Sequence, residues 1–393
     1  MIPLSLRYLP RYQSDFYWFT ISNLHEFPRF LHELVFTFPL SHDKIKQEEG
    51  YAMFSQNLKY YRLKNNLTKT DLAKKVGLSA MAITNYENGM RRPDMPTIKA
   101  LASALGIRTV DFLTTRNSNL SFAHGEFRKN TKMTLSQQEY VREAIEEYFS
   151  RFFEAVEVLG GEVLYPAPEL HSLPLSMNPE ENGAVLRRYM NISEHGPIGN
   201  MIELLENRGI LVFLLDIDNN AFSGMNGSVN GRPYIAVNQN MTAERIRTTI
   251  GHEIAHFAFA WPDDMASKEA EDMATAIAGA FLFPKDDAIR ELGIERRSIT
   301  TDMYMVCKEY GIAMSLLVFR AHLCNIIKDN VYKRYFVEHS RIENSRIEKE
   351  KTALFEQLVY RAVNENEISI QKGSELLKIP YSTVAENCRF AEG

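Results

Sequence analysis

Apolar and polar residues follow a helical period through residues 53–113, and this pattern predicts five short helices. Thr68 and Ser79 stand where helix N-caps belong, because a hydroxyl there accepts a hydrogen bond from a free backbone N–H. Gly77 and Gly106 stand at turns, where the left-handed backbone conformation favours glycine. The segment is therefore expected to fold as one small helical domain.

The pattern changes after this domain. Residues 116–135 are polar without a clear period and are expected to form a linker. A long helix follows, with Ser136 and Glu139 placed as an S-x-x-E capping box and the Gly160-Gly161 pair at its end. Residues 162–200 contain several prolines and little period, so they are expected to be rich in loops.

Two apolar runs, residues 210–217 and 233–238, are β-branched and aromatic, and they predict strands on either side of a turn rich in Gly and Asn. Helices are expected over residues 242–259 and 267–283, and Pro284 ends the second one. The chain beyond it has a helical pattern. The fold class predicted is mainly α with a small sheet (α+β).

Charge is unevenly distributed. Residues 52–113 carry ten basic and four acidic side chains, a net charge of +6, while the whole chain carries −5. A basic module on an acidic body indicates a polyanion partner for that module. No run of 18 uncharged apolar residues occurs, so no membrane span is expected, and three widely spaced cysteines favour a reducing cytoplasm.

Residues 68–79 supply the parts of a helix-turn-helix, in which a tight turn holds two helices near a right angle. Leu72, Ala73 and Val76 form the inner face of the first helix, and Ala73 is small where the helices approach each other. This arrangement places the second helix to enter a DNA major groove. A helical module for binding other proteins is the alternative interpretation.

Residues 58–107 closely resemble the XRE (Cro/lambda-repressor-type) helix-turn-helix. The resemblance implies a partly buried ion pair between Arg62 and Glu87. The family often has Gln where Lys69 stands, and Lys keeps only the phosphate contact. Operator DNA is the implied partner, bound by a homodimer. The implied phosphate contacts are Lys69, Ser79, Thr84 and Arg91, and the implied base-edge contacts are Ala80, Met81 and Asn85.

The predicted helix over residues 242–259 contains an H-E-x-x-H motif, formed by His252, Glu253 and His256. Histidines four residues apart lie on one helical face, which suits two ligands of a tetrahedral zinc ion. Glu253 between them can reach a water on the metal and act as general base. The alternative is a helix that carries two partly exposed histidines.

Residues 197–218, 233–257 and 278–284 together resemble the ImmA/IrrE metallopeptidase family, and the similarity extends over about residues 197–325. The resemblance implies a zincin-like α+β fold, a small mixed sheet packed on helices. It also implies a zinc cofactor. Family members joined to an XRE module resemble regulators in which the peptidase domain cleaves a repressor.

The third zinc ligand of this family is a carboxylate, eleven residues before the proline that ends the next helix. Counting back from Pro284 selects Met273, whose thioether is a poor zinc ligand. Glu271 and Asp272 are rotated from Met273 by roughly 200° and 100° on a regular helix, so neither simply substitutes for it. A one-residue bulge would bring Asp272 inward, and an earlier helix start would free Glu271. Glu271 is the candidate we retain.

Five segments are expected. They are an N-terminal extension (1–51), the helix-turn-helix domain (52–115), the linker (116–135), the peptidase-like domain (136–325) and a helical C-terminal region (326–393). The extension is either native or upstream of a translation start near Met53, since Gln47-Glu48-Glu49-Gly50 can be encoded by a purine-rich stretch resembling a ribosome-binding site.

Three functions fit these features. The first is a DNA-binding transcriptional regulator whose zinc metallopeptidase-like domain cleaves a repressor partner or itself. The second is a non-catalytic regulator whose degenerate peptidase domain senses a ligand or protein. The third is a peptidase that the basic module brings to a DNA-bound substrate. Zinc content, compared with and without Glu253→Gln, discriminates between the first two.

Overall fold

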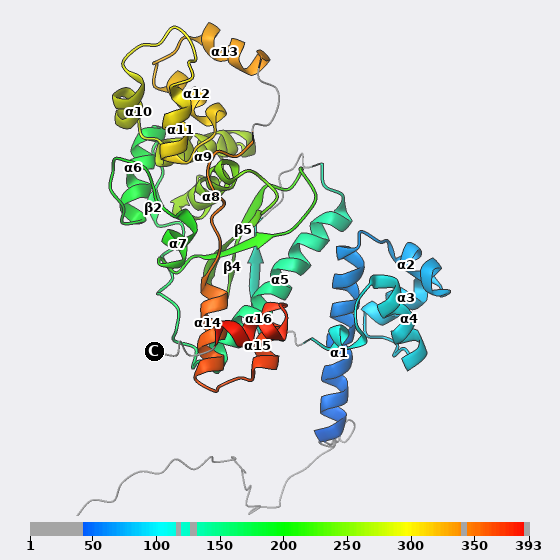
Figure 1. Ribbon diagram of the computed structural model, residues 1–393. Coiled ribbons are helices and arrows are strands. Elements are labelled where there is room, and N and C mark those ends of the chain that lie inside the picture. The colour runs from blue at the N-terminus through cyan, green and yellow to red at the C-terminus, as the bar shows by residue number, and fades with distance from the viewer. Residues whose placement is uncertain (1–41, 115–118, 126–131, 339–343, 389–393) are drawn as a thin grey trace, which may run out of the picture. The chain divides into compact units, whose positions relative to one another are not determined.

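The computed structural model describes residues 42–114, 119–125, 132–338 and 344–388 (Figure 1). The chain from Gln47 onward forms one compact unit. Most of the expected N-terminal extension, residues 1–41, lies outside the described part. The first helix, α1 (His42–Lys64), begins well before Met53, where the pattern places its start. Residues 44–49, Lys-Ile-Lys-Gln-Glu-Glu, are mostly good helix formers.

Four further elements complete the helix-turn-helix domain, and its caps are those predicted. Thr68 and Ser79 accept hydrogen bonds from the backbone at the starts of the second and third helices. Gly77 and Gly106 adopt left-handed conformations, with φ of 69° and 68°. The elements are α2 (Lys69–Val76), α3 (Ala80–Glu87), α4 (Met95–Leu105) and the 3-10 helix η1 (Thr109–Leu113).

The Arg62–Glu87 ion pair links α1 to α3, as the family resemblance implies. The Arg62 guanidinium donates to both carboxylate oxygens of Glu87, and one of these hydrogen bonds is 3.0 Å long. Arg62 also donates to the carbonyl of Leu67 at 2.9 Å. Both charged side chains are almost fully buried, so the hydrogen bonds between them replace those that each would make to water.

A four-stranded mixed sheet has the strand order β1-β4-β5-β3. The two predicted strands are β3 (Leu211–Leu215) and β5 (Arg232–Asn238), which pair in parallel. The expected turn between them contains a further strand, β4 (Gly224–Val229), antiparallel to β5. The expected linker supplies the edge strand, β1 (Phe122–His124). Both escaped the pattern because β4 is rich in Gly and β1 is very short.

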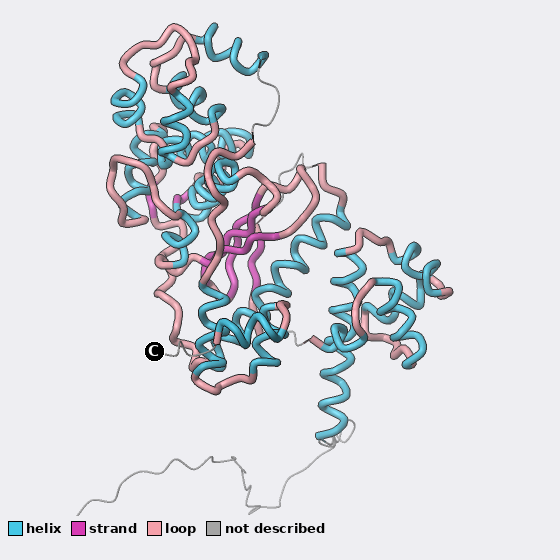
Figure 2. The backbone as a smooth tube through the Cα atoms, viewed as in Figure 1, coloured by secondary structure: helices cyan, strands magenta, loops and turns pink. Residues whose placement is uncertain are grey.

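Successive side chains of the sheet point to opposite faces, and each face has its own helix. On one face α5 (Leu135–Val158) packs with Phe149 against Tyr234, whose ring lies 5.1 Å away. On the other face α8 (Ala243–Ala258) shares a hydrophobic cluster with Ile235 and Val237. Figure 2 shows the strands between these helices. Packing against the sheet therefore fixes the position of α8.

The prediction for the start of the long helix was wrong. The first turn of α5 is capped by Thr134, which forms a capping box with Gln137, and not by Ser136 and Glu139. Residues 162–200 are mostly loop, as predicted, and they also contain an eleven-residue helix, α6 (Pro179–Tyr189), which Asn178 caps. Its proline stands in the first helical turn, where its missing N–H costs nothing.

The remaining elements confirm a mainly helical protein with a small sheet. Two short strands pair in parallel, β2 (Leu173–Pro174) and β6 (Phe259–Ala260). The other helices are α7 (Met201–Glu206), α9 (Ser267–Leu282), α10 (Lys285–Leu292), α11 (Met303–Tyr310), α12 (Met314–Leu323), α13 (Asp329–Glu338), α14 (Leu354–Asn364), α15 (Ile370–Leu377) and α16 (Tyr381–Asn387).

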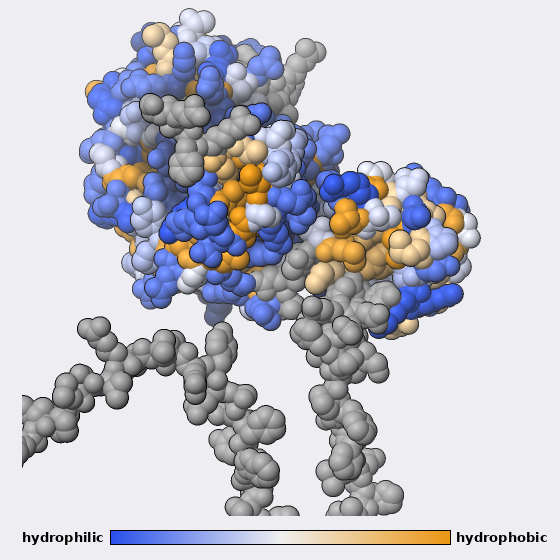
Figure 3. All heavy atoms as spheres, turned by 60° about the horizontal axis from the view of Figure 1, so that its bottom comes forward, coloured by the Kyte–Doolittle hydropathy of each residue, from blue (hydrophilic) through white to orange (hydrophobic). Residues whose placement is uncertain are grey.

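Among the described residues, none of the helices is long and apolar enough to cross a membrane. Figure 3 shows one face of the molecule, on which hydrophobic residues lie in patches between hydrophilic ones. The most exposed large hydrophobic side chains include Leu135, Ile294 and Val337.

Candidate functional site

Helix α8 carries the histidines and the glutamate of the motif to the wall of a cavity. Thr242 caps the helix by accepting a hydrogen bond from the backbone N–H of Arg245 at 3.4 Å. His252 and Glu253 are buried, while His256, one turn later, is partly exposed. The Nε2 atoms of His252 and His256 are 3.0 Å apart, so the two rings converge on one point.

Glu271 approaches the same point from α9. Its Oε2 atom lies 3.4 Å from Nε2 of His252, and its Oε1 atom lies 3.4 Å from Nε2 of His256. One potential ligand atom from each of the three residues falls within a group no wider than 4.8 Å. Asp272, the neighbouring carboxylate, is exposed.

Met273, which the count from the proline selects, packs against the hydrophobic core. The number of residues between a side chain and Pro284 does not determine which side of α9 faces the histidines. The packing of α9 on α8 determines it. The two helices approach closely at Gly251, where an added Cβ would meet that of Ala278 at 3.4 Å. This contact turns the Glu271 side of α9 toward the site. The helix begins at Ser267, as predicted, and is uninterrupted, so Glu271 reaches the site with neither an earlier helix start nor a bulge.

The three side chains fit a zinc ion in both chemistry and spacing. Two imidazole nitrogens and a carboxylate oxygen form a donor set common in catalytic zinc sites. Zinc bonds of about 2.0–2.1 Å in a tetrahedron place neighbouring ligand atoms about 3.3–3.4 Å apart. The separations of 3.0, 3.4 and 3.4 Å are close to this value.

Further side chains orient the histidines. Oγ1 of Thr275, which also donates to the carbonyl of Glu271, lies 3.3 Å from Nδ1 of His252. Trp261 donates its indole N–H to the carbonyls of Ala255 and His256, and so fixes the C-terminal end of α8. Partners of this kind hold a ligand ring in the orientation that metal binding needs.

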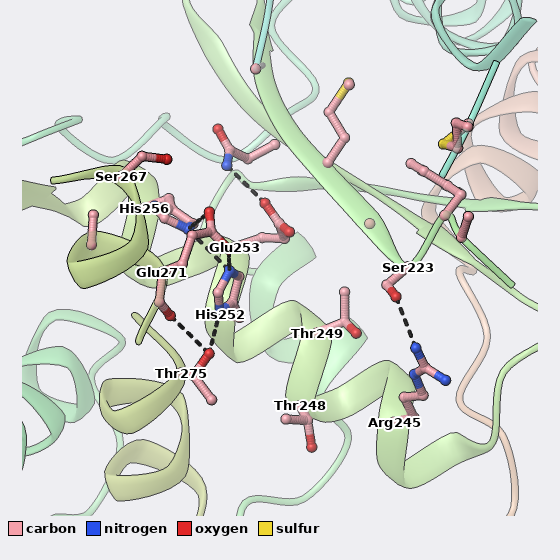
Figure 4. A pocket seen from close by; sticks show the side chains of 18 of the residues that line it. Ser223, Arg245, Thr248, Thr249, His252, Glu253, His256, Ser267, Glu271 and Thr275 are labelled. Carbon is pink, nitrogen blue, oxygen red and sulfur yellow. Dashed lines mark hydrogen bonds and ion pairs between the residues drawn. The ribbon is translucent and has the colours of Figure 1, made fainter. Parts of the chain in front are cut away.

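Glu253 is held by the sheet. The side-chain amide of Asn226 on β4 donates to Oε2 of Glu253 at 2.8 Å. This bond fixes the carboxylate through one of its oxygens at the cavity wall that the histidines share. Figure 4 shows Glu271 against His252 and His256, with Glu253 next to them.

These groups open into a cavity of about 830 Å³ between α8, α9 and β4. The volume is large enough for a stretch of polypeptide rather than a single small ion. Arg245 reaches its far end and donates to Ser223 at 3.1 Å (Figure 4). Gly125 and Lys132, from the expected linker, also line it.

The residues that the helix-turn-helix resemblance assigns to DNA all lie outside the core. Ser79, Met81 and Arg91 are exposed, and Met81 is 67% accessible. Lys69, Ala80, Thr84 and Asn85 are partly exposed. They come from the N-terminus of α2, from α3 with its cap, and from the loop after α3, as a surface that follows a groove requires.

Two of these residues have partners within the protein. Nζ of Lys69 lies 3.7 Å from the Glu87 carboxylate, so the Lys69 ammonium group is partly engaged by the buried ion pair. The hydroxyl of Thr84 donates to the carbonyl of Ala80 at 3.0 Å. The Arg91 guanidinium instead lies 6.0 Å from the centre of the Tyr86 ring, on an exposed side chain. Of the two assigned cations, Arg91 is therefore the one whose charge is more accessible to a phosphate.

Sequence reasoning did not identify Asn226, Thr275 or Trp261 as parts of the metal site. Each acts through a bond to a motif residue from another element, and no fixed spacing to the motif marks it. A weak signal exists only for Asn226, a polar residue between glycines in Gly224–Val229.

Comparison with known families finds two matches. Residues 58–112 match the model described as Helix-turn-helix, and residues 205–322 match the model described as IrrE N-terminal-like domain. The second match contains the histidines, Glu253 and Glu271. No solved structure matches the chain significantly.

Two curated relatives are HTH-type transcriptional regulators, both uncharacterised. The one from Bacillus subtilis is 36% identical over 77 residues, which are 20% of this chain and 66% of the relative. The one from Methanocaldococcus jannaschii is 41% identical over 54 residues, which are 14% of this chain and 82% of the relative. The chain therefore belongs to the HTH-type transcriptional regulators, and it carries an IrrE N-terminal-like domain as its second module.

Proposed function

We propose that this protein binds operator DNA through α3 and cleaves a protein repressor at a zinc site formed by His252, His256 and Glu271. The convergence of these three side chains beside Glu253, on the wall of a cavity wide enough for a peptide, carries the proposal. A helix-turn-helix on the same chain would bring the peptidase to DNA, where a repressor is bound.

The reaction is hydrolysis of a peptide bond. A zinc ion in this site would acidify a water molecule and polarise the carbonyl of the bond to be cut. Glu253 accepts a proton as the water oxygen adds to the carbonyl carbon, and returns it to the nitrogen as the C–N bond breaks. The products are a carboxylate and an amine. Asn226 keeps Glu253 in the orientation that this proton transfer needs.

Elemental analysis of the purified protein tests the metal site. We expect about one zinc per chain in the wild type and in Glu253→Gln, and little zinc in His252→Ala or Glu271→Ala. Met273→Leu is the matched control on α9 and should keep its zinc, since Met273 packs against the core. Absence of zinc from the wild type would leave a non-catalytic regulator as the function.

Hydrolysis is tested with fluorescein-labelled casein as the probe. The zinc-loaded wild type should release fluorescent fragments. Glu253→Gln should retain zinc and lose at least 100-fold in rate, in line with the usual contribution of a general base. Equal rates in the two proteins would remove Glu253 from the mechanism.

DNA binding is tested with operator fragments selected from the DNA upstream of the gene. Affinity should fall steeply as salt rises, because phosphate contacts release counterions. Arg91→Ala should weaken binding by about tenfold and lower the salt slope by about one. An affinity for DNA that does not change with salt concentration would overturn the assignment of this domain to DNA binding. Ultracentrifugation of the complex tests whether a homodimer binds.

A further inference from the structure

The sheet edge beside the metal site is covered by a strand from the segment between the two modules. Strand β1 pairs antiparallel with β4, with Phe122 opposite Val229 and His124 opposite Gly227. The pairing continues one residue further, where the N–H of Gly125 donates to the carbonyl of Asn226 at 2.8 Å.

Residues on the same edge of β4 also lie close to Glu253. Asn226, whose carbonyl accepts from Gly125, holds the Glu253 carboxylate with its side chain. Two residues earlier, Gly224 lies so close to α8 that an added Cβ would be 2.6 Å from Cγ2 of Thr249 and 3.6 Å from Cγ of Glu253. The backbone groups of alternate residues point to the same side of a strand, so Gly224 and Asn226 both present theirs to the outer edge.

Strand β1 runs along β4 toward the cavity. Because the strands are antiparallel, a chain that runs from Phe122 to Gly125 approaches Asn226 and then Gly224. Gly125 itself lines the cavity. An extended peptide that paired with β4 beside Glu253 would therefore need the Asn226 carbonyl that Gly125 now occupies.

We propose that β1 and Gly125 are a built-in occupant of the peptide-binding edge, so that a substrate must displace this segment to reach the metal site. This inference rests on the proposed peptidase function and adds its regulation. An extended segment of another protein is the ligand that the vacated edge fits, since main-chain hydrogen bonds along a strand accept many sequences.

The contacts of β1 are few enough to be exchanged. Only three residues form the strand, and the residue before it, Ser121, exchanges two hydrogen bonds with Asn230. The His124 side chain adds two polar contacts. Nδ1 of His124 is 2.6 Å from the Tyr234 hydroxyl, and its Nε2 is 3.0 Å from Glu146. Along the chain, β1 lies between the helix-turn-helix domain and α5.

Peptide binding by the full-length protein tests the proposal. The probe is a fluorescein-labelled peptide of residues 119–125, added to metal-free protein so that no hydrolysis occurs. In Gly125→Ala the new Cβ would meet the Asn226 carbonyl oxygen at 2.6 Å and force the segment off the edge. We expect this variant to bind the peptide at least tenfold more tightly than the wild type.

Gly199→Ala is the matched control, because nothing lies within 4 Å of a Cβ at that position. It should bind the peptide as weakly as the wild type. Ala123→Pro, which removes an N–H directed at β4, should bind as tightly as Gly125→Ala. Equal affinity of all four proteins for the peptide would overturn the proposal.

Casein cleavage by the zinc-loaded proteins separates this inference from the proposed function. If Gly125→Ala cleaves casein at least fivefold faster than the wild type, both stand. If the two cleave at equal rates, β1 is not an occupant that the substrate displaces, although the peptidase function survives. If neither cleaves casein while the variant binds the peptide, the edge is occupied as proposed and the peptidase function fails.

Discussion

At the scale of single residues, the stability of the helix-turn-helix domain depends on keeping its buried charges paired. The Arg62–Glu87 pair is the main example, since both side chains are shielded from water and bonded to each other. Removal of one member leaves the other charged and poorly solvated. Such a loss costs more than the intact pair contributes relative to apolar residues.

Arg62→Met is therefore expected to lower the free energy of unfolding by about 3–5 kcal/mol, measured by urea denaturation. The double variant Arg62→Met with Glu87→Met should be more stable than the single one, because no buried charge remains unpaired. Lys69→Met, at the exposed end of the same cluster, should change stability by less than about 1 kcal/mol. A double variant less stable than the single one would contradict this account.

The side chain of Glu206 on α7 has a pKa well above the ordinary value for a glutamate. Burial raises its pKa to about 7, although backbone N–H groups of Ala353 and Leu354 donate to it. The folded protein therefore binds this proton more tightly than the unfolded chain, whose glutamate titrates near 4.5. Stability from this group is present below pH 4.5 and is lost as the pH rises through 7.

Urea denaturation across this pH range checks the effect. Between about pH 4.5 and 7.5, the wild type should lose roughly 2–3 kcal/mol of stability that Glu206→Gln does not lose. Glu162→Gln, which changes an exposed glutamate that does not contribute to this shift, should follow the wild type. The same pH dependence in Glu206→Gln would assign the effect to another group.

At the scale of elements, helix starts depend on backbone geometry as well as on residue type. Both Thr134 and Ser136 offer a hydroxyl near the start of α5, but the backbone of Thr134 is extended, with φ of −68° and ψ of 158°. Only that conformation lets the hydroxyl reach the free N–H of Gln137.

Thr134→Ala should therefore cost about 1 kcal/mol of stability, the usual effect of losing an N-cap. Ser136→Ala, two residues later and inside the helix, should change stability by no more than about 0.5 kcal/mol. Thermal or urea unfolding of the two variants gives the comparison. A larger loss from Ser136→Ala would restore the cap that the sequence pattern predicts.

At the scale of the whole molecule, metal binding should couple to folding, because its three ligands come from two helices that meet only in the folded chain. A ligand that binds only the folded state raises its stability in proportion to the logarithm of ligand concentration. Zinc should therefore raise the melting temperature of metal-free protein by on the order of 5–10 °C, and EDTA should reverse the rise.

His256→Ala should show no such rise in a calorimetric scan. His195→Ala, an exposed histidine outside the three-residue cluster, should behave like the wild type. A zinc effect that survives His256→Ala would place the ion elsewhere.

The sequence by itself determined the features that depend on neighbours along the chain. The caps at Thr68 and Ser79, the glycine turns and the H-E-x-x-H spacing all arise within one or two helical turns, so local periodicity and residue type are sufficient. The Arg62–Glu87 pair came from resemblance to a family whose packing is shared.

Only the tertiary structure decided which carboxylate faces the histidines, because the close packing of α9 on α8 sets that choice and spacing from Pro284 does not. It also decided that Gly-rich β4 is a strand and that part of the expected linker joins the sheet. Strand pairing satisfies backbone groups from residues about a hundred positions apart, and such partners leave no local pattern in the sequence.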